Sequence, residues 1–408
     1  MNKTTLKKYA KLIVRVGVNL QEGQDVIINA SMDQKELVTL IVEEAYLAKA
    51  RKVKVDWNEL PEIYKLMVKY ESLETLSEVP NWSVEKLKYQ VEKNPARIYV
   101  LSDDPDALKG IDQEKVAKMR MARHKVVKPY VDQMNNQYQW TIVAAPSEKW
   151  AKKVFPSLSK KEAINKLWDA ILLTARVNGD PIKNWENHNQ DLLSRCNYLN
   201  SFDFDYLEYK ASNGTDFKVW MLDKCQWLGG GETSLRGIYY NPNMPTEECF
   251  TTPIKGKAEG VVYATKPLSY NGELIENFSF TFKDGKVVSF HAEKGEELLR
   301  HMLSMDDSAS YLGECALVPF SSPVNETGIL FYNTLFDENA TCHLALGAGF
   351  SDCVKNYENY TKKDFDEMGI NDSIIHVDFM IGTKDLNITG VTKDGQRVAL
   401  FRNGTWAF

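Results

Sequence analysis

Between Asp25 and Ser147 the chain alternates short apolar runs with longer amphipathic segments, and this alternation restricts the possible folds most strongly. The apolar runs are DVIINA from Asp25, KVKVDW from Lys52, ARIYVLS from Ala96 and QWTIVAA from Gln139. Helical patterns separate them, such as QKELVTLIVEEAYLAKA from Gln34 and QEKVAKMRMARHKVVKPYVDQM from Gln113. Strands spaced by helices need crossover connections, which favour a mostly parallel sheet with helices on its faces. The sequence therefore predicts an α/β N-terminal domain of the doubly wound type.

The pattern changes after Tyr206, where strand-like runs flank turn dipeptides at Asn213-Gly214, Asp284-Gly285 and Asp394-Gly395. Such dipeptides are typical of β-hairpins. One helix is expected between Glu293 and Ser304, and helical patterns from Lys160 and Ile182 precede the change. We therefore predict an α/β N-terminal domain over residues 1–195 and a mixed α+β, strand-rich, metal-binding catalytic domain over residues 196–408.

The composition narrows the classes of partner. A chain of 408 residues can bury more than one core, and a formal net charge of −6 gives no basic excess to attract nucleic acid. Charges interrupt the apolar runs of the N-terminal segment, which reads as an amphipathic helix, not a signal peptide. No uncharged apolar stretch approaches the roughly 18 residues of a membrane span. We expect a cytoplasmic protein without a membrane or nucleic-acid partner.

The cysteines lack CxxC spacing and lie in a chain large enough not to need disulfides, so we expect them to be reduced and mostly buried. They are Cys196, Cys225, Cys249, Cys315, Cys342 and Cys353.

The segment SIIHVDFMIG places His376 and Asp378 two residues apart in an apolar run that is typical of a buried strand. Alternation along a strand puts both side chains on one face. The structural alternative is a core histidine oriented by its neighbour, but a buried aspartate must be paired or coordinated. By contrast, His124, His188 and His301 lie in patterns of surface or terminal helix.

The same environment recurs at Glu248 in PTEECFTTP, Glu314 in YLGECALVPF and His343 in DENATCHLALG, each directly beside a cysteine. If these segments are extended, each cysteine packs away from the site while its neighbour faces it. The resulting donor set is Glu248, Glu314, His343, His376 and Asp378, with oxygen and nitrogen atoms and no thiolate. Such a set suits two divalent metal ions (Zn, Co, Mn or Mg) with positions left open for water, and suits a structural zinc site poorly.

The glycine run WLGGGETS from Trp227 lacks the residue order of a phosphate-binding loop, so a flexible loop is the better reading. The aromatic residues in GIYYNPNMP fit a hydrophobic pocket or a core equally well.

Taken in order, NMPTEECFTTP, GECALVP, LFDENATCHLALG and HVDFMIG resemble the motif set of the thermophilic-type metallo-aminopeptidases, the AmpS/AmpT/PepS-like group. The N-terminal LKKYAKLIVRVGVNLQEGQDVIINA is also similar to the opening of that family. The resemblance implies that the five donors above hold a pair of divalent ions in the C-terminal domain. It further implies a homodimer with an enclosed cavity that admits short peptides with a free N-terminus.

One residue departs from the family pattern. Where that family usually reads HxALGxAY, this chain reads HLALGAGF, so Phe350 stands in place of a tyrosine whose hydroxyl helps to stabilise the tetrahedral intermediate. The loss of one such donor lowers turnover by a factor of about 10² to 10³.

The function predicted from the resemblance is that of a metallo-aminopeptidase, a hydrolase that releases N-terminal amino acids through water activated by two metal ions. Glu248 or Glu314 is the carboxylate that accepts and passes on the proton, and the sequence does not choose between them. The alternatives are a di-metal hydrolase of another small amide and a binding protein that has lost turnover, the latter favoured by Phe350 alone. Prolines at 242, 245 and 253 restrict the backbone around Glu248, whereas Glu247 is expected to be a supporting or surface residue.

Overall fold

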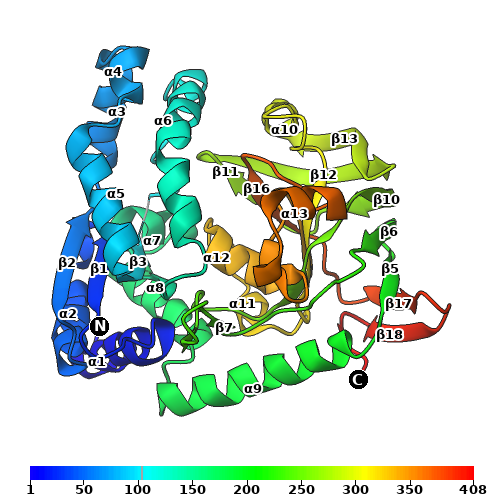
Figure 1. Ribbon diagram of the computed structural model, residues 1–408, viewed down its shortest axis with the longest axis horizontal. Coiled ribbons are helices and arrows are strands. Elements are labelled where there is room, and N and C mark those ends of the chain that lie inside the picture. Colours follow the sequence, from blue (N-terminus) through cyan, green and yellow to red (C-terminus); the bar gives the residue numbers. More distant parts are fainter. Residues whose placement is uncertain (103) are drawn as a thin grey trace. The chain divides into compact units, whose positions relative to one another are not determined.

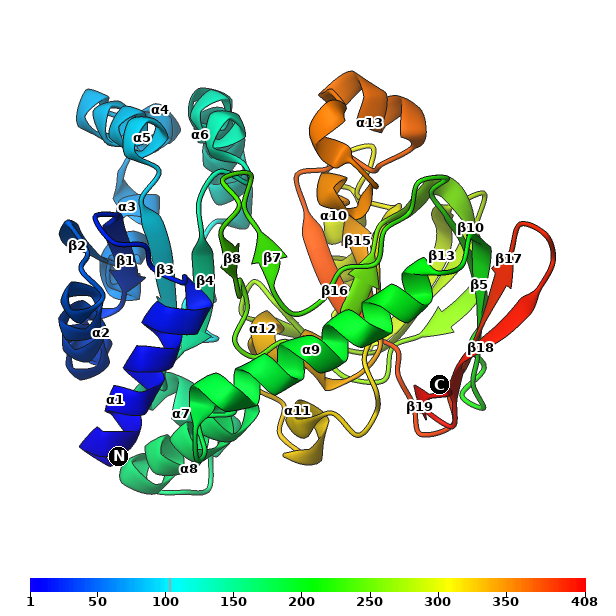
Figure 2. The same cartoon turned by 60° about the horizontal axis from the view of Figure 1, so that its bottom comes forward.

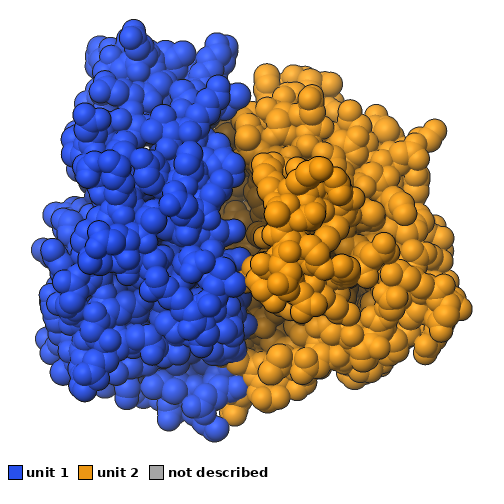
Figure 3. All heavy atoms as spheres, viewed as in Figure 1, with its two compact units in different colours: residues 1–186, 231–244 blue, residues 187–230, 245–408 orange. Residues whose placement is uncertain are grey.

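The computed structural model describes residues 1–102 and 104–408, and the chain divides into two compact units. Unit 1 contains Met1–Glu186 and Gly231–Met244, and unit 2 contains Asn187–Gly230 and Pro245–Phe408 (blue and orange in Figure 3). A short segment of the second half thus belongs to the first unit. The division at residue 195 stays a prediction.

Unit 1 is built around a parallel sheet, as the alternating pattern predicts. Its strands are β1 (Asp25–Ala30), β2 (Lys52–Trp57), β3 (Ala96–Leu101) and β4 (Trp140–Ala144). They lie in the order β2-β1-β3-β4, and each neighbouring pair is parallel. The predicted α/β architecture of this region is confirmed.

Helices precede, connect and follow these strands. They are α1 (Lys3–Leu12), η1 (Ile13–Gly17), η2 (Met32–Gln34), α2 (Lys35–Leu47), α3 (Pro61–Tyr70), α4 (Leu73–Ser77), α5 (Asn81–Lys93), α6 (Gln113–Met134), α7 (Glu148–Val154) and α8 (Lys160–Thr174). Within this unit, α3, α4, α5 and α6 gather at the end away from α1 (Figure 1). There α3, α4 and α6 share a small apolar cluster of Val68, Leu76, Val116 and Met119, which packs these helices against one another.

Unit 2 contains a large antiparallel sheet in the order β11-β12-β10-β6-β5-β17-β18-β19, with β13 paired to β12. The strands are β5 (Phe204–Lys210), β6 (Asp216–Met221), β10 (Pro253–Tyr263), β11 (Leu268–Tyr270), β12 (Glu273–Lys283), β13 (Lys286–Lys294), β17 (Asn387–Thr392), β18 (Arg397–Arg402) and β19 (Thr405–Trp406). The three predicted hairpins are confirmed as β5-β6, β12-β13 and β17-β18.

A second antiparallel sheet of unit 2 has the order β16-β15-β14-β9. It is formed by β9 (Cys249–Thr251), β14 (Leu312–Leu317), β15 (His343–Gly347) and β16 (His376–Met380), and Figure 2 shows β15 and β16 side by side. Residues of both sheets belong to one apolar core, where Phe379 of β16 packs against Phe280 of β12 with ring centroids 5.0 Å apart. One face of this second sheet is therefore buried in the core, and the opposite face is available for polar residues.

The remaining elements are short, apart from one long helix. They are α9 (Pro181–Asn200), β7 (Glu232–Thr233), β8 (Tyr239–Tyr240), α10 (Glu296–Leu303), α11 (Pro323–Glu326), α12 (Thr334–Asp337), η3 (Glu338–Ala340), η4 (Ser351–Cys353), η5 (Tyr357–Asn359) and α13 (Lys362–Met368). The helix expected near Glu293 to Ser304 is present as α10. No helix in the described part of the chain has the length and apolar character that a membrane crossing requires.

Candidate metal centre

The register of the β16-β15-β14-β9 sheet places the candidate residues on one face. Ala345 lies opposite both Glu314 and Asp378, and Gly347 lies opposite His376. Directly opposed residues of antiparallel strands project from the same face, and so do residues two positions apart on one strand. His343, two residues before Ala345, therefore shares this face, which we call the polar face.

Small residues occupy the middle of the polar face. Ala316, Ala345 and Gly347 separate the ionisable side chains along β14 and β15. Gly347 has φ +103°, and a Cβ atom there would lie 2.0 Å from the carbonyl oxygen of Ile375. Only glycine fits this position, and the absence of larger side chains leaves room for the long carboxylates around it.

The cysteines lie on the other side, as the alternation predicts. Cys249, Cys315 and Cys342 are buried in the apolar core with Leu344 and Leu346. Burial raises the pKa of the Cys342 thiol to about 12, so this sulfur stays protonated. The sulfur atoms are therefore packing groups, and the ligand set is left with oxygen and nitrogen.

Glu248, Glu314 and His343 form the first of two groups whose ligand atoms all lie within 4.8 Å of one another. The Nε2 atom of His343 lies 3.2 Å from Oε2 of Glu248 and 4.0 Å from Oε1 of Glu314. All three side chains are at least nine-tenths buried, with exposed fractions of 8%, 6% and 1% for Glu248, Glu314 and His343. The geometry brings together residues that are 95 positions apart in the sequence.

Glu314, His376 and Asp378 form the second group within the same limit of 4.8 Å. The Nε2 atom of His376 lies 3.1 Å from Oε2 of Glu314 and 3.3 Å from Oδ1 of Asp378. His376 is the more accessible of these residues, since 26% of its side chain is exposed. Glu314 is common to both groups, each of its oxygens facing a different imidazole.

The imidazoles are oriented from behind by backbone carbonyl groups. Nδ1 of His376 donates to the Ala348 oxygen at 2.8 Å, and Nδ1 of His343 lies 3.3 Å from the Thr341 oxygen. Metal-binding histidines usually use one ring nitrogen in this way, which fixes the ring and leaves the other nitrogen for the ion. Both Nε2 atoms are aimed at carboxylates.

Charge is unbalanced within the cluster. Burial alone would lower the pKa of His343, but the carboxylates of Glu248, Glu314 and Asp378 raise it to about 9. Burial, with the neighbouring Glu248 and Asp378 carboxylates, raises the pKa of Glu314 to about 6, although His376 opposes the shift. These directions mean that the carboxylates repel one another and stabilise any cation that approaches them.

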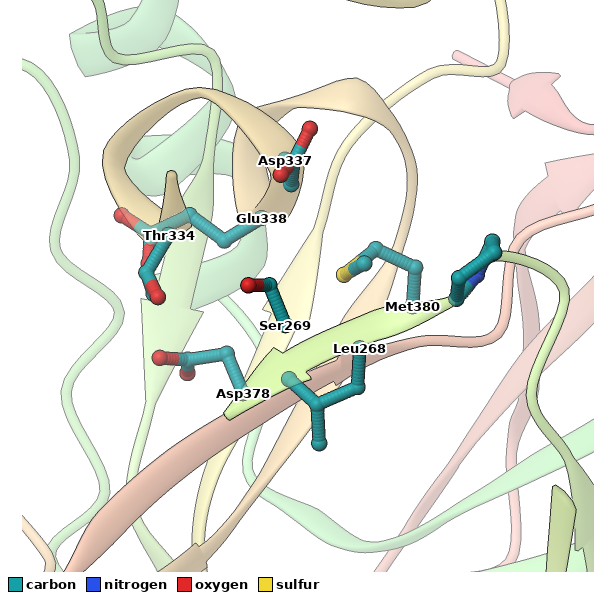
Figure 4. Close-up of a pocket in the computed structure, with 8 residues that line it drawn as sticks. Leu268, Ser269, Thr334, Asp337, Glu338, Asp378 and Met380 are labelled. Atoms are coloured by element: carbon teal, nitrogen blue, oxygen red, sulfur yellow. The ribbon is translucent and has the colours of Figure 1, made fainter. Parts of the chain in front are cut away.

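Sequence reasoning missed Glu338, which faces the same cluster. Its pKa is raised well above the usual range, first by burial and then by the carboxylates of Asp378, Glu248 and Glu314. Glu338 and Asp378 line the same small pocket and extend to the same side of it (Figure 4). Glu338 lies in the η3 turn, not on a strand, so alternation does not place it; the adjacent acids of DENATCH were the available signal.

The residues present fit divalent cations. Four carboxyl groups (Glu248, Glu314, Asp378 and Glu338) face two imidazoles, so the acidic groups outnumber the basic ones. Oδ1 of Asp378 is buried, and its contact with Nε2 of His376 at 3.3 Å does not have the geometry of a hydrogen bond. Buried carboxylates need a paired charge or a bound cation, and an oxygen- and nitrogen-donor set of this kind is suited to hard or borderline metal ions.

The Glu248 segment is held by residues far away in the sequence. The backbone N–H of Glu247 donates to Oδ1 of Asn339 at 2.7 Å, and the His188 ring contacts the Thr246 carbonyl at 2.7 Å. Glu247 is buried, so of its two predicted roles the surface one is wrong and the supporting one fits, and His188 is half-buried, so its reading as a solvated helix residue is wrong. Both residues lie in tertiary contacts that local sequence does not reveal.

The glycine run also supports this segment. Leu228 forms a β-bridge with Phe250, and a Cβ atom at Gly229 would lie 2.4 Å from the Glu248 carbonyl oxygen. Gly229 is thus required by close packing against the backbone of a candidate ligand. The flexible-loop reading of this run is wrong at that position.

Phe350 follows β15 and lies beside the cluster. Its ring centroid is 4.9 Å from that of His376 and 5.7 Å from that of Phe250. Tyr360 lies ten residues after Phe350 and carries a hydroxyl group, but that hydroxyl accepts a hydrogen bond from Lys224. The phenyl ring of Phe350 occupies the place next to His376 and offers no hydrogen-bond donor.

Comparison with known proteins gives a consistent result over the whole chain. The family model described as thermophilic metalloprotease (M29) matches residues 2–406. The chain is 44% identical to aminopeptidase AmpS of Bacillus subtilis (strain 168) and 44% identical to aminopeptidase 2 of Geobacillus stearothermophilus, each over 99% of this chain and 98% of the relative.

A solved structure agrees in fold as well as sequence. Wild-type AmpT from Thermus thermophilus matches with a TM-score of 0.90 and 37% identity, covering 100% of both chains. Matches of this length and identity, together with the family model, establish the relationship: the chain belongs to the thermophilic metalloprotease (M29) family.

Proposed function

We propose that this chain is a metal-dependent aminopeptidase that releases N-terminal amino acids from short peptides. The observation that carries the proposal is the polar face, where two groups of buried donors share Glu314. Relatives named aminopeptidases, 44% identical over 99% of the chain, support the same activity.

We further propose that the cluster holds two divalent ions, Zn, Co, Mn or Mg. Glu248, Glu314 and His343 would hold one, and Glu314, His376 and Asp378 the other, with Glu314 shared. When bound, such ions lower the pKa of water and polarise the carbonyl group of the scissile bond.

The residues of the chain have distinct tasks in this mechanism. A free α-amino nitrogen would bind at the metal-holding cluster, which an N-acetylated end cannot do, so the site selects peptides with a free N-terminus. Glu248 or Glu314 accepts the proton of the attacking water and passes it to the nitrogen of the leaving peptide. The carbonyl groups of Ala348 and Thr341 keep the imidazoles fixed while the reaction proceeds.

A comparison of free and blocked substrates tests this function. The protein is first stripped of metal with a chelator and then reloaded with Zn²⁺ or Co²⁺. Each peptide is supplied with a free N-terminus and with an N-acetylated one. We expect hydrolysis of the free peptides only, and only after the metal is restored. Equal hydrolysis of both sets would favour a di-metal amidase of another kind.

A second candidate, a metal-binding protein without turnover, is favoured by Phe350 alone, because that ring replaces the hydroxyl expected from the family pattern. Uptake of metal without hydrolysis of any free peptide would support it. The cytoplasmic location, the homodimer and the division at residue 195 remain predictions.

A further inference from the structure

The cluster is accessible mainly at one residue. Side-chain exposure is 8% for Glu248, 6% for Glu314, 1% for His343 and 7% for Asp378, whereas it is 26% for His376. A peptide that reaches these groups from solvent therefore meets the His376 end first.

An aromatic pair lies at that end. Phe350 has a ring 4.9 Å from the His376 ring and is 37% exposed, and Phe250 packs edge-to-face against it at 5.7 Å. Phe250 lies opposite Ala316 in the β9-β14 register, which puts it on the polar face. The accessible end of the cluster is thus bordered by apolar rings.

The backbone holds Phe350 firmly. Its N–H donates to Oγ1 of Thr252 at 2.7 Å, and the same hydroxyl lies 3.3 Å from the Phe350 carbonyl oxygen. A Cβ atom at Gly349 would lie 2.6 Å from Cγ2 of Thr252, so the chain passes Thr252 closely. A backbone fixed in this way holds the Cα atom of Phe350 in place and so keeps the ring beside His376.

We propose that Phe350, backed by Phe250, forms an aromatic surface that binds the side chain of the first residue of the peptide and selects large apolar residues there. The inference rests on the proposed function. An α-amino group that binds at the group of Glu314, His376 and Asp378 leaves its own side chain within a few bonds of His376, next to the exposed ring. Small-molecule sites commonly combine such an apolar wall with a few fixed polar groups.

The test compares L-phenylalanine p-nitroanilide with L-alanine p-nitroanilide on the metal-loaded enzyme. We expect the wild type to prefer the phenylalanine substrate, and Phe350→Ala to lower the ratio of the two kcat/KM values by about tenfold or more. The ratio is informative because partial loss of metal lowers both values equally.

Matched variants separate the ring from other effects. Phe350→Tyr keeps the ring and should keep the ratio, while its new hydroxyl changes kcat for both substrates alike. Phe350→Leu keeps an apolar side chain and should lower the ratio by about threefold, which also serves if the alanine variant does not fold. Val288→Ala, at an exposed position of β13, should change nothing.

Two results would overturn the inference. If Phe350→Ala and Phe350→Leu leave the ratio at its wild-type value, the ring does not select the side chain, and the proposed aminopeptidase function is unaffected. If the wild type hydrolyses neither substrate nor any peptide with a free N-terminus, the proposed function fails, and calorimetry of L-phenylalaninamide with zinc-loaded protein decides the inference. Equal affinities of wild type and Phe350→Ala would then contradict it.

Discussion

On the β16-β15-β14-β9 sheet, the two faces are built from alternating residues of the same short strands. Glu314 and His343 lie on the polar face, and their neighbours Cys315 and Leu344 lie in the core. Of two adjacent residues on these strands, one therefore contributes a donor to the cluster and the other packs in the core. The core face fixes where the strands lie, and the polar face uses that rigidity to hold like charges together at a cost that the core packing offsets.

Glu314→Gln should give the largest effect. The amide keeps the shape of the side chain but removes the charge that is common to both groups, so we expect kcat/KM for free-N-terminal p-nitroanilides to fall by about 10³-fold or more. The thermal unfolding temperature should stay near that of the wild type, because the core face is intact.

Glu326→Gln, at an exposed position of α11, is the control and should leave activity unchanged. Near-normal hydrolysis by the Glu314 variant would show that the polar face is not where the reaction occurs.

Asn339→Ala should have an intermediate effect, because it should lower both the stability of the fold and the catalytic activity. It leaves the buried N–H of Glu247 without its acceptor, which costs about 1–3 kcal/mol of the free energy of unfolding. Because the same bond holds the segment of Glu248, kcat/KM should also fall by about 10- to 100-fold.

Chemical denaturation and steady-state kinetics measure the two effects in one preparation. Asn359→Ala, which changes an exposed asparagine, is the matched control. Unchanged kinetics in the Asn339 variant would mean that Glu248 is positioned by other contacts.

Cys315→Ser should give the smallest effect on catalysis. Unlike Glu314→Gln, it should lower the stability of the fold and leave the activity nearly unchanged. The hydroxyl would be buried in the apolar core, so we expect the free energy of unfolding to fall by about 1–3 kcal/mol. Activity per folded molecule should remain within about twofold of the wild type. A large loss of kcat/KM with unchanged stability would contradict the division of tasks between the faces.

The strand parts of this arrangement are readable from the sequence because they depend on local periodicity. DVIINA and KVKVDW mark β1 and β2, and the spacing of His376 and Asp378 places both on one face of β16. The 22-residue pattern from Gln113 likewise coincides with α6, although Pro129 lies inside the helix.

The missed features all depend on tertiary contacts. Glu338 lies in a turn, so no alternation assigns it to the cluster. His188 is on a helix with a polar pattern, and only the folded chain brings it to Thr246. The sequence suggests that Gly229 belongs to a flexible run, but in the structure it packs against the carbonyl group of Glu248. Distances between segments remote in sequence are set by packing of the whole unit, which local patterns do not encode.

Anomalous scattering from crystals soaked in Zn²⁺ or Co²⁺ tests the central claim most directly. The account predicts two peaks on the polar face, one among Glu248, Glu314 and His343 and the other among Glu314, His376 and Asp378, with Glu314 in contact with both. Peaks confined to other parts of the surface, or none within bonding distance of Glu314, would contradict it.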